Sequence, residues 1–102
     1  PCNPIYADTG PGTPCPTGMY KVGPVPMTGS MRPAIHGGEY LYVEPYRGQP
    51  VLGHIISNGK WLHQVTAETK DAVRTAGLAN RHSDPWTPKS EIKYIVRYVL
   101  RQ

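Results

Sequence analysis

The chain has 102 residues, 38% of them hydrophobic, and carries a formal net charge of +4. This length suits one small domain, and no run of about eighteen apolar residues occurs that could cross a bilayer as a helix. The Lys and Arg residues are scattered and form no basic block, so we expect no nucleic-acid partner. Because the sequence opens at Pro1 without a signal-peptide pattern, we expect a processed or truncated chain.

Residues 1–26 contain most of the 12 prolines of the chain. Proline is excluded from helix interiors and from most central strand positions, so we predict an irregular N-terminal arm with one short strand at 19–22. Cys2 and Cys15 lie in this arm. We expect a disulfide between them, worth about 2–4 kcal/mol, and therefore an oxidising compartment. Two free thiols are the alternative, and no metal site is expected from two thiols without a Cys-x-x-Cys pair.

Residues 27–102 show strand patterns and no long helical period. Residues 40–43 are aromatic and β-branched, which favours a strand. Residues 54–57 contain a short apolar run, and Asn58-Gly59 directly after it predicts a hairpin turn. The return strand is expected at 61–67.

Two more strands are expected toward the C-terminus, at 71–75 and at 92–100. The second is the longest, and its alternation predicts one face formed by Ile92, Tyr94, Val96, Tyr98 and Leu100 and an opposite face carrying Ile95 and Val99. Short strands and many turns predict a mostly β domain, either a small barrel or a folded sheet.

Ser30 lies in a turn-forming stretch, Thr-Gly-Ser-Met-Arg-Pro over residues 28–33. Pro33 restricts the backbone of Arg32, which helps to define the local path. A turn of this kind can expose a hydroxyl and direct backbone N–H groups at one point. A serine on its own in a turn would more often only cap that turn.

Two later blocks contain further groups suited to catalysis. His63 lies in Leu-His-Gln-Val over 62–65, shortly after Gly-His-Ile-Ile over 53–56. Asp84 precedes Pro85, after Thr-Ala-Gly-Leu-Ala-Asn over 75–80. A histidine can take a proton from a serine hydroxyl near neutral pH, and an acid can orient its ring.

In this order the blocks resemble the type I signal peptidases over residues 27–100. The family's serine motif is Gly-x-Ser-Met-x-Pro followed by a Gly-acidic pair, here Gly38-Glu39. Bacterial enzymes carry Lys-Arg-Val at the second block, whereas endoplasmic-reticulum and archaeal enzymes carry His-Arg-Val, so His63 resembles the Ser-His type. The family's later Asp-Pro matches Asp84. The sequence departs from the family at His54 and Leu78, where acids are usual.

The resemblance implies a small folded β-sheet domain over 27–102, as in signal peptidases and the self-cleaving SOS-type repressors, preceded by the arm 1–26. It implies a serine endopeptidase that cleaves an extended segment of a secreted or membrane precursor after small residues. Ser30 would be the nucleophile, His63 its base and Asp84 the orienting acid. The Ser30 backbone N–H and the Thr28 hydroxyl would form the oxyanion hole. No cofactor or metal is implied.

By the same resemblance we expect an extracytoplasmic location, on the periplasmic, extracellular or lumenal side of a membrane. A segment outside this sequence would hold the domain near that membrane. The precursor would pair with a strand edge, for which the Met27 side and the strand at 40–43 are candidates. Lys60 is a rival base, and Trp61 and Trp86 are expected in the core or at its rim.

Two other functions stay open. One is a self-cleaving protease of the same fold. The other is a catalytically inactive β module that binds a protein partner, which the departures at His54 and Leu78 favour.

Overall fold

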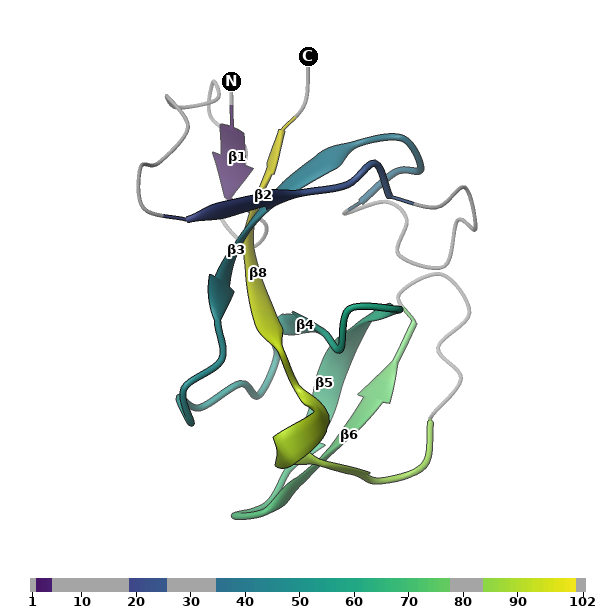
Figure 1. Cartoon of the computed structure of the whole chain (residues 1–102). Helices are drawn as coiled ribbons and strands as arrows, with labels where there is room; N and C mark the ends of the chain where they lie inside the picture. The colour runs from purple at the N-terminus through teal and green to yellow at the C-terminus, as the bar shows by residue number, and fades with distance from the viewer. Residues whose placement is uncertain (1, 5–18, 26–34, 78–83, 101–102) are drawn as a thin grey trace.

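The computed structural model describes residues 2–4, 19–25, 35–77 and 84–100. These residues form eight strands and one short 3-10 helix (Figure 1). The elements are β1 (Cys2–Pro4), β2 (Tyr20–Val22), β3 (Tyr40–Pro45), β4 (Ile55–Ser57), β5 (Leu62–Glu68), β6 (Ala72–Ala76), β7 (Thr87–Pro88), η1 (Lys89–Glu91) and β8 (Tyr94–Leu100). Within the described ranges, no helix has the length and apolarity needed to cross a membrane.

All pairs of strands are antiparallel and belong to one sheet, with the order β2-β3-β8-β4-β5-β6-β7. The long strand β8 joins the two halves of the molecule (Figure 1). One edge of β8 pairs with β3. On the other edge, β4 pairs with the first residues of β8 and β1 pairs with its last residues. The mostly β class predicted from the sequence is therefore correct.

Several predicted elements are present close to their expected positions. The strand expected at 19–22 is β2, and the strand expected at 71–75 is β6. The predicted hairpin joins β4 to β5. Its turn is stabilised by the Asn58 side chain, whose Oδ1 accepts the backbone N–H groups of Lys60 at 2.8 Å and Trp61 at 3.1 Å. Gly59 has a φ of 95°, a value that favours glycine.

The N-terminal arm takes part in the sheet to an extent that its composition did not predict. β2 pairs with β3, so the strand at 40–43 has neighbours on both sides and is not the free edge that we expected. The short strand β1 was not predicted at all, and it pairs with β8. The division into 1–26 and 27–102 remains a prediction.

The last strand differs from its predicted form in two ways. It begins at Tyr94 rather than at residue 92. The register then shifts between Tyr42, opposite Tyr98, and Val43, opposite Val96, so that Arg97 is an extra residue on β8. This β-bulge interrupts the alternation, and Val96 and Val99 pack in the same cluster although strict alternation placed them on opposite faces. The strand is partly buried on both faces, with Ile95 in the second cluster described below and Val96 and Val99 in the first.

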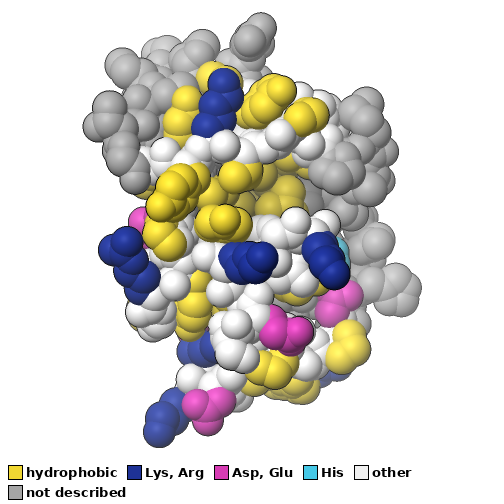
Figure 2. All heavy atoms as spheres, in the orientation of Figure 1, with side chains coloured by type: hydrophobic (Ala, Val, Ile, Leu, Met, Phe, Trp, Pro, Cys, Tyr) yellow, Lys and Arg dark blue, Asp and Glu magenta, His cyan; other side chains and the backbone are white. Residues whose placement is uncertain are grey.

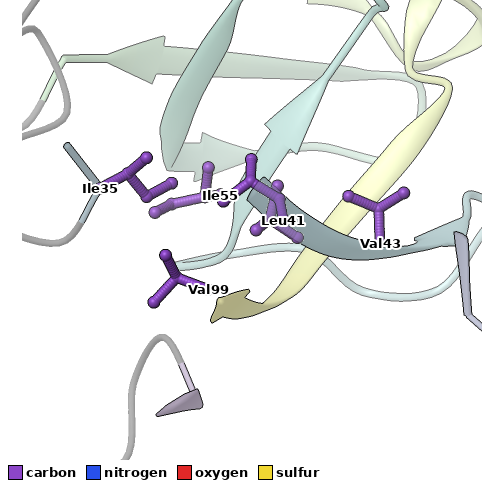
Figure 3. Close-up of a cluster of buried hydrophobic side chains, with 6 residues drawn as sticks. Ile35, Leu41, Val43, Ile55 and Val99 are labelled. Atoms are coloured by element: carbon purple, nitrogen blue, oxygen red, sulfur yellow. The ribbon is translucent and has the colours of Figure 1, made fainter. Parts of the chain in front are cut away.

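Two clusters of buried side chains form the core of the described structure. The first, called the upper cluster here, contains Ile35, Leu41, Val43, Ile55, Val96 and Val99 (Figure 3). The second, the lower cluster, contains Val51, Ile56, Val65, Val73, Ile92 and Ile95. The adjacent residues Ile55 and Ile56 on β4 belong to different clusters, as do Ile95 and Val96 on β8. The central strands therefore separate the two clusters and contribute side chains to both.

The surface combines exposed hydrophobic side chains with basic ones. In Figure 2 the hydrophobic side chains gather in the upper and central part of the face shown, and acidic side chains lie mainly below them. Tyr20 is 58% exposed and meets Tyr94 edge to face, with ring centroids 6.4 Å apart. The Lys21 ammonium lies 4.9 Å from the centroid of the Tyr40 ring. These contacts order the exposed side chains of β2.

Candidate active site

The sequence-predicted site residues divide into two groups. Ser30 and Thr28 lie outside the described residues, as do Cys15 and Leu78. Cys2 belongs to β1, but its side chain is not described. The nucleophile, the oxyanion hole and the disulfide therefore remain predictions, whereas His63 and Asp84 can be located.

His63 and Asp84 are in direct contact. His63 is on β5, opposite Ile56 of β4 in the register. Its Nδ1 atom lies 2.6 Å from Oδ2 of Asp84, and the two side chains are 25% and 35% exposed. The structure thus brings together two residues that the sequence assigned to the same site, in a position that solvent reaches.

The neighbouring strand β6 holds Asp84 in place. The Asp84 backbone N–H donates to the carbonyl oxygen of Thr75 at 2.8 Å, and the Arg74 Nε donates to the Asp84 carbonyl oxygen at 3.2 Å. The Thr75 hydroxyl donates to Oδ2 of Asp84 at 2.9 Å. Both the backbone and the carboxylate of Asp84 are therefore bonded to β6, although Asp84 itself is outside a regular strand.

Trp61 packs against the imidazole ring. The ring centroids of Trp61 and His63 are 5.3 Å apart and the interplanar angle is 23°, which is a stacked arrangement. Trp61 is partly buried against the lower cluster, as expected for a core or rim residue. Its contact with His63 was not predicted, although two residues spaced by two on a strand share a face, and that spacing was a usable signal.

This arrangement selects one protonation pattern for the imidazole. A carboxylate can only accept hydrogen bonds, so Nδ1 of His63 carries the proton that Asp84 accepts. In the neutral ring, Nε2 is then an unprotonated acceptor. An imidazole held in this way can take a proton from a hydroxyl or from water on its Nε2 side.

The rival base Lys60 lies in different surroundings from His63. Lys60 is exposed in the turn before β5. A lysine that acts as a base is usually removed from solvent, whereas Lys60 is exposed to it. Among the described residues, no group of three or more His, Cys, Asp and Glu side chains could hold a metal ion.

Comparisons of the chain with protein-family models, with curated proteins and with solved structures found no match. The features that point to a function are therefore the motif around Ser30 and the geometry around His63.

Proposed function

We propose that this protein is a serine endopeptidase of the signal-peptidase type, with Ser30 as nucleophile, His63 as base and Asp84 as the residue that orients the imidazole. The single observation that carries the proposal is the 2.6 Å contact between Nδ1 of His63 and Oδ2 of Asp84. The two residues come from separate blocks of the sequence, and the contact of Nδ1 with the carboxylate leaves Nε2 as the atom of the ring that can act as the base.

The packing around the segment that contains Ser30 also supports the proposal. Val25 and Ile35 are the described residues on either side of residues 26–34. Ile35 is a member of the upper cluster, and Val25 packs against it. Leu62, the residue before His63, packs against the same cluster, so the beginning of β5 lies beside these anchors, whereas the His63 side chain points to the opposite face of the strand. Ser30 is five residues from each anchor, and five residues span at most about 17 Å.

The chemistry follows from these roles. Nε2 of His63 takes the Ser30 hydroxyl proton while Oγ attacks the carbonyl carbon of the scissile bond. The oxyanion is stabilised by the Ser30 backbone N–H and the Thr28 hydroxyl. The imidazolium then protonates the leaving amine, which gives an acyl-enzyme. A water molecule then attacks the acyl carbon while His63 takes its proton, and the imidazolium returns this proton to Oγ of Ser30 as the acid is released.

The substrate is proposed from the resemblance to the family, as an extended segment of a secreted or membrane precursor with small residues before the cleaved bond. The domain then works on the extracytoplasmic side of a membrane, close to its surface. Among the described strands, β2 and β7 stand at the ends of the sheet order, and β3 lies inside it. β2 therefore replaces the strand at 40–43 as a candidate edge for pairing with the precursor.

The test is covalent labelling of the full chain with a fluorophosphonate, which reacts with activated serines. We expect intact-mass analysis to show one adduct on the wild type, mapped to Ser30, and none on Ser30→Ala. Ser90→Ala is the matched control because Ser90 is exposed on η1, and it should label like the wild type. Failure of the folded wild type to react would contradict the enzyme and leave the inactive binding module as the better account.

A further inference from the structure

Thr75 is an unusual residue for its position in the sheet. It is 1% exposed and lies on β6 opposite Val65 of β5, a member of the lower cluster. A valine has nearly the same shape and would suit such a position without a polar atom. A buried hydroxyl costs free energy unless it is hydrogen-bonded, so the presence of one here calls for a partner that needs it.

That partner is Asp84, which Thr75 contacts twice. The Thr75 carbonyl oxygen accepts the Asp84 backbone N–H at 2.8 Å, and the Thr75 hydroxyl donates to Oδ2 of Asp84 at 2.9 Å. The first bond fixes the backbone of Asp84 and the second fixes its side-chain rotamer. Oδ2 is the same oxygen that lies 2.6 Å from Nδ1 of His63.

We propose that Thr75 is a positioning residue, whose hydroxyl holds Oδ2 of Asp84 against Nδ1 of His63 and so keeps Nε2 unprotonated in the neutral ring. This inference rests on the proposed function for its catalytic consequence, but the effect on the imidazole is independent of it. Thr75 touches Asp84 and acts on the reaction through it.

Asp84 needs such support because its own surroundings restrain it weakly. Its side chain is 35% exposed, so water competes for the carboxylate oxygens. An exposed aspartate also gains entropy by leaving a single rotamer. Thr75 has less of this freedom, because its branched Cβ and its burial both restrict χ1. The hydrogen bond from the Thr75 hydroxyl therefore holds the partly exposed Asp84 carboxylate in a fixed position relative to β6.

The first measurement is ¹⁵N NMR of the imidazole of His63 in the full chain, which distinguishes the two neutral tautomers. The wild type is expected to hold the Nδ1–H form at high pH. Thr75→Val removes the hydroxyl at constant shape and should shift the ring toward a mixture with the Nε2–H form. Thr75→Ser should behave as the wild type. An unchanged tautomer in Thr75→Val would overturn the inference, whether or not the protein is a peptidase.

The second measurement is cleavage of a peptide with small residues before the scissile bond. Thr75→Val should lower kcat by about tenfold, the size expected for one lost hydrogen bond, with KM little changed. Thr75→Ser should recover most of the rate. Thr66→Val is the matched control, since the Thr66 hydroxyl on the adjacent strand donates to the exposed carbonyl oxygen of Arg74 at 3.3 Å instead of to the Asp84 carboxylate. It should retain full activity.

The two readouts separate the two proposals. A tautomer that depends on Thr75 in a protein without peptidase activity would retain the positioning role and refute the proposed function. An active wild type whose kcat is unaffected by Thr75→Val would overturn the catalytic role of Thr75 alone. If the valine variant does not fold, Thr75→Ala is measured in its place, because it also removes the hydroxyl but puts no methyl group next to the Asp84 carboxylate.

Discussion

At the scale of single residues, the site consists of an imidazole restrained on two sides. Asp84 bonds its Nδ1 edge and Trp61 covers one face, so the ring has little freedom to rotate. Such restraint favours catalysis because a base must already be oriented when the hydroxyl approaches. The tryptophan also offers a π face to the imidazolium that forms during the proposed reaction.

The stacking makes a prediction about Trp61. Trp61→Leu should lower kcat about two- to fivefold, because a cation–π contact of this kind is worth about 0.5–1 kcal/mol. Trp61→Phe keeps an aromatic face and should lose less. Trp86→Leu is the control, since Trp86 is 48% exposed and its loss should leave the rate unchanged. Equal rates for Trp61→Leu and the wild type in a peptidase assay would show that the stacking has no role in the reaction.

At the scale of elements, the carboxylate of Glu68 at the end of β5 bonds both the loop before β4 and the 3-10 helix η1. Glu68 accepts the backbone N–H groups of Val51 at 3.1 Å and Leu52 at 3.0 Å, and it lies 2.8 Å from Nζ of Lys89 on η1. The hydrogen bond from Lys89 is the main cause that lowers the pKa of Glu68, against an opposing effect of burial. The same bond raises the pKa of Lys89.

Glu68→Gln should therefore destabilise the protein in a pH-dependent way. A carboxylate with a lowered pKa contributes stability above its ordinary pKa of 4.5 and loses it as pH falls through the folded value. A lysine with a raised pKa contributes below its ordinary value of 10.5 and loses it as pH rises through the folded one. Urea unfolding at several pH values should show the largest deficit of the variant near neutral pH. A deficit that persists unchanged at pH 3 would refute this role of the ion pair.

The approach of β2 to β3 makes a second prediction at this scale, which concerns Gly23. Gly23 has a φ of 138°, and a Cβ there would lie 2.9 Å from Cδ1 of Tyr40 and 3.0 Å from the Glu39 carbonyl oxygen. Gly48 has a φ of 90° but open space around it. Both alanine variants should carry backbone strain, and Gly23→Ala should lose about 1–3 kcal/mol more because of crowding. Equal urea midpoints for the two variants would contradict the close approach.

At the scale of the whole molecule, the mostly β class could be predicted from the sequence, and the structure brings together two residues of the candidate site, His63 and Asp84. Residues such as Asn58-Gly59 carry local signals, so the β4–β5 hairpin could be predicted. The bulge at Arg97 and the strand β1 could not, because they depend on pairing between segments distant in the chain. Thr75 was missed for a related reason, since a threonine in a strand is usual and only its contact with Asp84 distinguishes it.

A pH–rate profile tests the proposal that His63, restrained by Asp84, is the base for Ser30. The profile is measured for the wild type, His63→Ala, Lys60→Ala and Asp84→Asn on one peptide with small residues before the scissile bond. The wild-type rate should fall as the pH is lowered, because a protonated imidazole cannot accept the serine proton.

His63→Ala should lose most of the activity, and the remaining activity should no longer fall at low pH. Asp84→Asn should lose less activity, because Asp84 only orients the ring. Lys60→Ala should match the wild type, as expected for an exposed residue of the turn. An inactive Lys60→Ala beside an active His63→Ala would show that the base, and with it the proposed site, is wrong.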